Sequence, residues 1–502
     1  MKTMTRRMFL AASSIAFAKA IMAKESVALT GYSKGNQLSK IDGVKLLNLW
    51  GEQPEPVQNL YKLIDSILSA DREATYADVN RDETVQQFCK DYNVLHLGGP
   101  MLGCITETSA KVWVRTVRPA RVELRLNIDG AETTYGPILS TEESDLVSIV
   151  PVTGLKPGIS YPYKVLVAGI PIPVPKHAAI TTVPDTNQLR LAFGTCPHRW
   201  GLGNQKQADL IRSRKPSALL MYGDIAAQDK NNHLGKHRLD YQVRDFYPAW
   251  QSLSSTIPMY ATWDDHDYFN NDKAGIPIGY KNTDRFGVCR TFSQAWNNPS
   301  YGFNDERGGV FLRTRFGPCD VIMLDNRYFR TGEKRGFLGN DQTEWLKKQL
   351  LDCKGPFIII SCGTMWTDHI SKGKDSWGTY DPQGREHLFR LIEDNQIPGV
   401  LLLSGDRHGA CGFRIPRPSG HTFYEFEAAS LGGRIGPASK AEDHPDALYS
   451  ISGKYAFGEF TFDATLDDPE VKFRLIHEEG ETLYEHILKH SELTPPAQKR
   501  HK

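Results

Sequence analysis

Four ionisable side chains follow a short apolar stretch near the middle of the chain. The stretch is Ile257–Trp263, and the side chains after it are Asp264, Asp265, His266 and Asp267. When a strand delivers such a cluster to the edge of a sheet, the carboxylates meet a low dielectric and cannot all ionise without a cation. A solvated acidic turn is the competing interpretation. Five more apolar runs that end in the same way favour the cation site.

These five runs alternate with helical patterns. They are Leu189–Phe193, Ala218–Tyr222, Val321–Leu324, Phe357–Ile360 and Val400–Leu403. The helical patterns cover Gln205–Arg214, Arg238–Leu253, Gln342–Leu351 and Arg385–Asn395. Apolar strands with helices between them predict a largely parallel sheet with covered faces, whose ligands lie beyond the carboxyl ends of the strands. We therefore expect the six polar clusters to meet at one edge.

The residue types in these clusters suit two metal ions. The metal-binding types that follow the runs include Cys196, His198, Asp224, Asp265, Asp406 and His408. Thiolate and imidazole bind a borderline metal, carboxylates bind hard or borderline metals, and one carboxylate can bridge two ions. Several clusters in order, each just after a strand, predict a metal site far more strongly than a single pair would.

Six motifs give the catalytic part a resemblance to a known family. They are FGTC (193–196), GD (223–224), WDDHD (263–267), LDNRYFR (324–330), LGNDQTEWLKKQL (338–350) and SGDRH (404–408). In their order and spacing they resemble the alkaline phosphatase D family of calcineurin-like metallophosphoesterases, over most of 94–490. The resemblance implies an α/β fold of layered sheets with helices on the outside, preceded by a small all-β sandwich. It also implies hydrolysis of phosphate monoesters or diesters by a metal-bridging hydroxide.

The resemblance carries roles to three catalytic residues. His266 looks like the histidine that stabilises the transition state and protonates the leaving oxygen; a histidine that caps a turn is the alternative. Arg327 and Arg407 lie at strand ends and could bind phosphate oxygens in a bidentate fashion, although structural salt bridges are an equal alternative. Asp325 is expected to orient Arg327 or a metal ligand.

The chain departs from the family at one metal ligand. Members with a ferric ion carry a tyrosine three residues after the bridging aspartate, where this chain has Ala227. Cys196 and His198 offer a replacement, with a spacing that mirrors the Asp-x-His of ordinary metallophosphoesterases. We assign metal one to Cys196, His198, Asp224 and His408, and metal two to Asp224, Asp265 and Asp406. Zinc or iron suits site one, and calcium, magnesium or manganese suits site two. The alternative is that His198 faces solvent and Cys196 is a buried thiol.

The N-terminus predicts export. Arg6 and Arg7 precede a short, weakly apolar stretch, so residues 1–23 resemble a twin-arginine export signal that would deliver the protein to the periplasm or medium. Residues 24–95 predict a helical N-terminal cap, and 96–184 a β-sandwich with the tyrosine corner Leu155–Tyr163. The catalytic domain is predicted at 185–490 and a polar tail at 491–502.

Composition restricts the partners. The 502 residues are 40% hydrophobic, enough for more than one core, and the net charge of +1 gives no overall field for nucleic acid. The eight cysteines have no CxxC pair, and we expect no transmembrane anchor.

The expected partners are a small phosphate ester and the export machinery. A lipid- or nucleotide-directed phosphodiesterase, or an inactive binding protein on the same scaffold, are the alternative functions.

Overall fold

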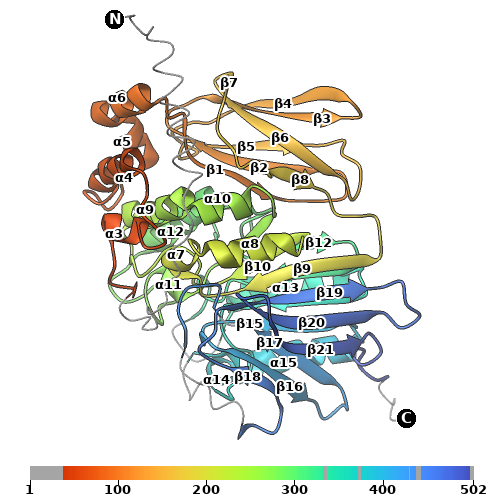
Figure 1. Ribbon diagram of the computed structural model, residues 1–502. Coiled ribbons are helices and arrows are strands. Elements are labelled where there is room, and N and C mark those ends of the chain that lie inside the picture. Colours follow the sequence, from red (N-terminus) through yellow and green to blue (C-terminus); the bar gives the residue numbers. More distant parts are fainter. Residues whose placement is uncertain (1–37, 332–335, 371–374, 429, 437–442, 498–502) are drawn as a thin grey trace, which may run out of the picture.

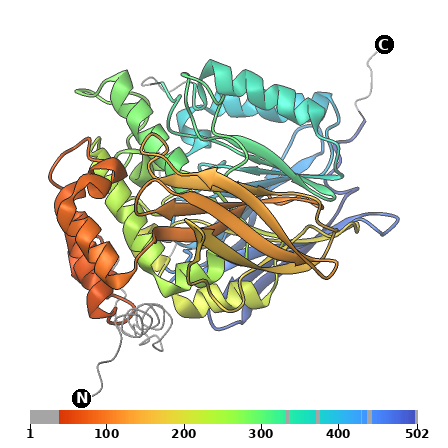
Figure 2. The same cartoon turned by 90° about the horizontal axis from the view of Figure 1, so that it is seen from above.

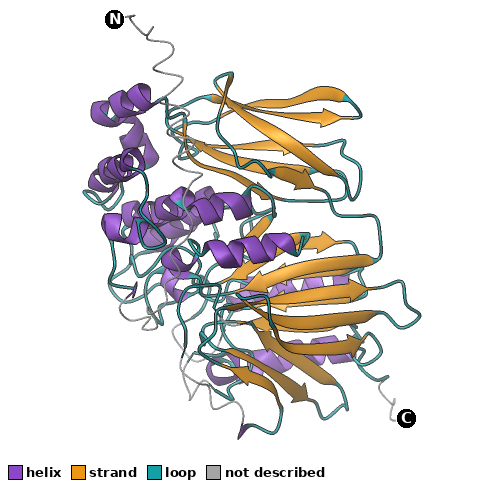
Figure 3. Cartoon of the chain, viewed as in Figure 1, coloured by secondary structure: helices purple, strands orange, loops and turns teal. Residues whose placement is uncertain are grey.

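The computed structural model describes residues 38–331, 336–370, 375–428, 430–436 and 443–497 (Figure 1). The predicted export signal at 1–23 lies outside the described residues. Along the chain, as the colours of Figure 1 show, a group of helices comes first, then a β-sandwich, and then two larger sheets with helices; Figure 3 distinguishes the helices from the strands. None of the described helices combines the length and apolar character that a membrane span needs.

The first helices lie beside the β-sandwich (Figure 2). They are α3 (Gly43–Leu47), α4 (Glu55–Leu68), α5 (Tyr76–Arg81) and α6 (Glu83–Tyr92). In α4 the buried residues Val57, Leu60, Tyr61, Ile64 and Leu68 recur at helical spacing and form one apolar stripe. That stripe belongs to the same core as the residues of α9 (Leu234–Phe246), on which α4 packs.

The β-sandwich has two sheets of antiparallel strands. One consists of β1 (His96–Gly103), β2 (Ala110–Thr116) and β5 (Val147–Val152), in the order β1-β2-β5. The other has the order β4-β3-β6-β7 and consists of β3 (Arg121–Ile128), β4 (Ala131–Leu139), β6 (Ser160–Val167) and β7 (Ile170–Pro171), with β8 (Ala179–Thr181) also on β6. The predicted tyrosine corner forms, because the Tyr161 hydroxyl accepts a hydrogen bond from the Lys156 N–H at 2.9 Å.

The six predicted strands divide between two sheets rather than forming one. The first sheet, β11-β10-β9-β19-β20-β21, contains the parallel strands β9 (Gln188–Gly194), β10 (Ala218–Tyr222) and β11 (Met259–Thr262). Antiparallel strands β19 (Ala456–Asp463), β20 (Glu470–His477) and β21 (Thr482–Lys489) extend it.

The second sheet has the order β12-β13-β14-β15-β17-β16-β18. Its strands are β12 (Leu312–Phe316), β13 (Cys319–Met323), β14 (Phe357–Ser361), β15 (Val400–Ser404), β16 (Ala410–Pro416), β17 (Thr422–Glu427) and β18 (Ala447–Ile451). Phe426 of this sheet packs on Phe460 and Phe473 of the first, with ring centroids 5.5 and 4.6 Å apart. The two sheets therefore share a core, and the expectation of a single parallel sheet is wrong.

Helices cover the outer face of each sheet, which confirms the predicted layers. On the first sheet these include α7 (His198–Gly201), α8 (Gln205–Ser213), α9, α10 (Pro248–Ser254), α11 (Asp265–Tyr268) and α12 (Asn282–Ala295). On the second sheet they include α13 (Gly339–Asp352), α14 (Trp377–Tyr380) and α15 (Pro382–Asp394). The single helix expected at Arg238–Leu253 is divided, because Pro248 has no N–H to continue α9.

Two smaller findings complete the fold. All eight cysteines are free thiols. Part of the polar tail is packed rather than frayed, since Leu493 is only 1% exposed and its carbonyl accepts from the Gly399 N–H at 3.0 Å.

Candidate metal centre

The loops that follow the parallel strands meet where the two sheets adjoin. Those after β9, β10 and β11 carry Cys196, Asp224 and Asp265, and the loop after β15 carries Asp406 and His408. Four of these five residues have φ values in the left-handed region, which are 53° at Cys196, 52° at Asp224, 78° at Asp406 and 60° at His408. Such conformations cost non-glycine residues free energy and concentrate at functional sites.

Hydrogen bonds tie the three loops of the first sheet together. The Cys196 N–H donates to the Gly223 carbonyl at 3.0 Å, and the His198 N–H donates to the Asp224 carbonyl at 2.8 Å. The carboxylate of Asp267 accepts from the N–H groups that follow Asp224, at 2.9 and 3.0 Å. The position of Asp224 is thus fixed from both neighbouring loops.

Two glycines permit the loops to approach this closely. A Cβ at Gly223, where φ is 128°, would lie 2.7 Å from the Cβ of Asp264. A Cβ at Gly363, in the loop after β14, would lie 2.8 Å from the Cγ of the same aspartate. Only glycine leaves room for Asp264 between loops from both sheets.

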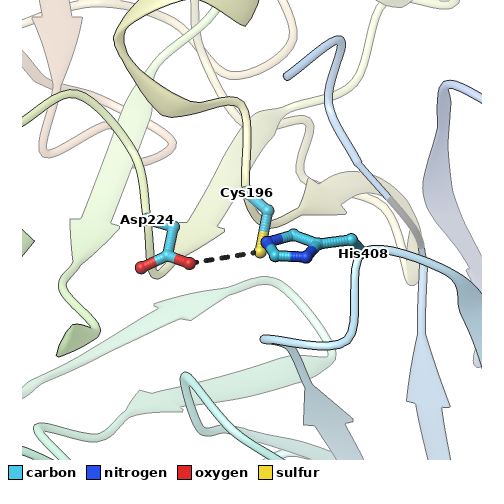
Figure 4. Close-up of side chains that lie close together, drawn as sticks. All are labelled: Cys196, Asp224 and His408. Atoms are coloured by element: carbon cyan, nitrogen blue, oxygen red, sulfur yellow. Dashed lines mark hydrogen bonds between the residues drawn. The ribbon is translucent and has the colours of Figure 1, made fainter. Parts of the chain in front are cut away.

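Three groups of side chains among the described residues could each hold a cation, and Asp224 belongs to all three. One is Cys196, Asp224 and His408 (Figure 4), another is Asp224, Asp265 and His266, and the third is Asp224, Asp264, Asp265 and Asp406. Within each group the donor atoms all lie within 4.8 Å of one another. The Cys196 thiol also points at Asp224, with Sγ 3.6 Å from Oδ2.

The carboxylates of the centre are buried and incompletely bonded. Oδ1 of Asp224, Oδ2 of Asp264 and Oδ1 of Asp265 are buried with no hydrogen-bond partner among the described residues. Burial, opposed by the charge of His266, raises the pKa of Asp224 well above its usual range. Burial likewise raises the pKa of Asp406 to about 8. Buried acids with free oxygens fit bound cations, which would favour their charged forms.

His198 lies beside these groups but in none of them. Its Nε2 is 3.3 Å from Nε2 of His408, and its Nδ1 is 2.5 Å from Oε1 of Gln228. Burial lowers the pKa of His198 well below its usual range and that of His408 to about 3. Two neutral imidazoles that face each other can each offer a lone pair. The positive charge of Arg434 adds to the lowering of both pKa values.

His266 is held by a carboxylate and an amide. Its Nδ1 lies 2.6 Å from Oδ1 of Asp229 and 3.0 Å from Nε2 of Gln228. Burial lowers the pKa of His266, but the charges of Asp224 and Asp229 outweigh burial and raise the pKa well above its usual range. Asp229 therefore orients the ring and favours its protonated form.

The two arginines predicted to bind phosphate are both paired with carboxylates. Arg327 is fully buried and bonds to Asp264 and Asp375, with Asp265 at 3.7 Å. The backbone N–H of Arg327 donates a hydrogen bond to the Asp325 carboxylate at 3.0 Å. Arg407 bonds to Asp406 and to the Asp375 carbonyl. These contacts fit the structural alternative for Arg327, whose side chain is fully buried, although its Nη1 has no hydrogen-bond partner among the described residues.

The sequence reasoning missed four residues of this centre. Asp264 was visible in the acidic run but was not assigned to metal. Gln228 and Asp229 follow Asp224 by four and five residues in a loop without periodicity, and Asp375 reaches Arg327 from a distant segment. Only Asp264 carried a signal in the sequence.

Comparison with known proteins gives the family. A model of the PhoD-like phosphatases matches residues 212–473, more than half of the chain. The chain belongs to the PhoD-like phosphatase family. The members of that family are phosphoric ester hydrolases, which is the class of enzyme predicted from the sequence. The family match and the groups of potential ligands together support the binding of metal ions. A second model, a domain of unknown function (DUF7800), matches residues 94–183.

Individual relatives are distant. Alkaline phosphatase D of Bacillus subtilis (strain 168) is 22% identical over 216 residues, which are 37% of this chain and 36% of that protein. The solved structure of PhoD has a TM-score of 0.63 at 16% identity, covering 78% of this chain and 90% of that chain, and so shares the fold. GAP50, the anchor in the inner membrane complex of Plasmodium, has a TM-score of 0.37 at 14% identity over 61% of this chain and 89% of that chain, too low to support an argument.

Proposed function

We propose that this protein is an exported metal-dependent phosphoesterase whose centre holds two cations that share Asp224. The single observation that carries the proposal is that Asp224, which is fully buried, belongs to all three groups of potential ligands. A carboxylate in that place can bridge two ions. Membership of a phosphatase family supports phosphate esters as the substrates.

The donor types indicate which residues would hold each ion. Metal one would be held by Cys196, Asp224 and His408, with His198 beside them to supply a fourth donor in place of the tyrosine that Ala227 replaces. A thiolate and imidazoles favour zinc or ferrous iron. Metal two would be held by the carboxylates of Asp224, Asp265 and Asp406, and Asp264, whose carboxylate lies within 4.8 Å of theirs, would be a further ligand. These suit calcium, magnesium or manganese.

The protein's own residues then act on the phosphate ester. Bound cations would neutralise charge on the phosphoryl oxygens and lower the pKa of a water molecule. His266, held protonated by Asp229, donates its Nε2 proton to the leaving oxygen. Arg327 is proposed to fix Asp264 rather than touch substrate, and Arg407 to fix Asp406. Arg434 is half-buried, and its charge lowers the pKa values of His198 and His408. We propose that its guanidinium binds the substrate phosphate.

Hydrolysis of nitrophenyl phosphate and bis-nitrophenyl phosphate, with and without a chelator, tests the activity. Chelation should abolish turnover, and added metal should restore it. Preference for the bis ester would indicate the phosphodiesterase alternative. Full activity in metal-free protein would refute a metal-dependent reaction, and no activity with metal bound would indicate a binding protein.

Two narrower proposals have their own tests. His198→Ala should lower the content of one metal and leave the other in place; unchanged metal content would remove His198 from the ligand set. For export, replacement of Arg6 and Arg7 by lysine in the full chain should keep the protein in the cytoplasm of its host. Undiminished export of that variant would exclude the twin-arginine route.

A further inference from the structure

A charged cavity lies at the opposite ends of the strands that lead to the metal centre. Its volume is about 800 Å³. Its wall includes β8, the start of β9, the loops before β10 and β11, the end of α8 and the end of β19. Because β9, β10 and β11 are parallel, the cavity and the metal centre are separated by the strand length, about 17 Å for five residues. The cavity is therefore a separate site.

Positive charge dominates the wall. Arg190, Arg212 and Lys215 line it, and Asp463 is the carboxylate among the lining residues. Asp463 already accepts from the side chain of Gln188 at 2.9 Å. Outside the lining, Glu459 lies 3.6 Å from Arg190, and Asp209 lies 2.7 Å from Arg212.

Each of the three cations keeps a donor for a ligand. Nη1 of Arg190 donates to the Arg214 carbonyl, and Nη2 of Arg190 has no partner among the described residues. Nη2 of Arg212 donates to Asp209, and Nη1 of Arg212 likewise has no partner among them. Lys215 is exposed, and within the described part of the chain its ammonium makes no ion pair or hydrogen bond. Donors of this kind, lining one cavity, suit the oxygens of an anion.

The rest of the wall is rich in hydroxyl groups. It includes Ser160, Thr181, Thr186, Ser217 and Thr256. Thr181 and Ser160 bond to each other at 3.0 Å on the β-sandwich side, where both are exposed and retain capacity for another partner. A volume of this size accommodates an organic molecule rather than a bare ion.

We propose that this cavity binds a small hydroxylated organic anion, with its phosphate or carboxylate on Arg190, Arg212 and Lys215 and its hydroxyl groups on the β-sandwich side. Such a ligand contacts Thr181 of the sandwich and Lys215 of the catalytic region at once. It therefore stabilises the contact between the two. The inference does not depend on the proposed phosphoesterase activity.

Calorimetric titration of the full chain with a non-hydrolysable hexose 6-phosphonate tests the site. The titration is carried out on the Asp224→Asn variant, because weaker metal binding there reduces binding of the phosphonate at the metal centre. In that background Arg212→Ala/Lys215→Ala should weaken binding at least about tenfold, because two charge-assisted contacts are lost. The matched control is Lys111→Ala/Lys164→Ala, which removes two exposed lysines of the sandwich that do not line the cavity. Equal binding by the double variant and its parent would overturn the proposal.

Further measurements separate the possible causes. Lys215→Glu, a change at an exposed residue, should weaken binding even if the double variant does not fold. Inorganic phosphate should bind more weakly than the phosphonate; equal affinity would overturn the role of the hydroxyl groups. In the wild-type background the double variant should hydrolyse nitrophenyl phosphate at the normal rate. Because burial and the charge of Arg212 lower the pKa of His177, an anion bound there should raise the pKa of that ring.

Discussion

The two ends of strands β9, β10 and β11 carry opposite charge. At the carboxyl ends, Asp224 and its neighbours bury carboxylate oxygens that have no hydrogen-bond partner among the described residues, whereas at the amino ends Lys215 and two arginines line an open cavity. Buried charges need a counter-ion to be stable, while exposed charges are satisfied by water. One end of the strands therefore requires cations for a stable charged state, whereas the other end is stable with or without a ligand.

Asp224→Asn should have the largest effect. It keeps the shape of the side chain but removes the shared charge, so both cations should bind weakly and turnover should fall by on the order of a thousandfold or more. In metal-free protein the same change removes the free-energy cost of burying an unpaired carboxylate, so the thermal stability of that protein should not fall. Metal analysis, turnover and thermal unfolding check these results. Wild-type activity with a full metal content would remove Asp224 from the bridging position.

His266→Ala should lower turnover by about a hundredfold while metal content stays the same, because a proton donor to the transition state typically contributes that much. The measurement is turnover together with metal content. Since His266 also lies within 4.8 Å of donor atoms on Asp224 and Asp265, loss of metal in step with activity would instead make it a ligand.

Asp229→Asn should shift the pH dependence of kcat/KM. In the folded protein Asp229 helps to raise the pKa of His266, so its removal lowers that pKa. His266 is active when protonated, and activity is lost as the pH rises through its pKa. The alkaline limb should therefore move to lower pH, costing about tenfold per pH unit above the new pKa. Asp272→Asn, a nearby exposed carboxylate, is the control. An unmoved limb would show that Asp229 does not control His266.

Tyr163→Phe should have the smallest effect. The buried Tyr163 hydroxyl donates to the Ser255 carbonyl at 2.9 Å and joins the β-sandwich to the segment between α10 and β11. Its loss should lower the free energy of unfolding by about 1 kcal/mol and leave turnover unchanged. Tyr135→Phe, which loses an exposed bond to the Thr153 carbonyl within the sandwich, should cost less. A fall in turnover would show that the two ends of the strands are coupled.

Much of the fold could be predicted because buried parallel strands leave continuous apolar runs. The division into two sheets could not, since β10 and β14 are both fully buried and read alike in sequence. How the two sheets pack on each other depends on contacts between residues distant in the chain, such as Phe426 with Phe473. The break before α10 did have a signal, in Pro248.

The candidate site could also be predicted only in part. Its ligand types could be predicted because each directly follows a strand, and the structure brings Cys196, Asp224 and His408 together. The roles of these residues stay predictions. Asp229 and Asp375 could not be found, because irregular loops carry no periodicity that places a side chain. Their positions depend on tertiary bonds to His266 and Arg327.

Anomalous X-ray scattering from crystals of the protein as isolated tests whether two cations share Asp224. Data collected at the absorption edges of the metals found by elemental analysis should show two peaks per chain, both in contact with the Asp224 carboxylate. One should also contact Cys196 and His408, and the other Asp265 and Asp406. No peak at Asp224 in protein that hydrolyses nitrophenyl phosphate would contradict the account.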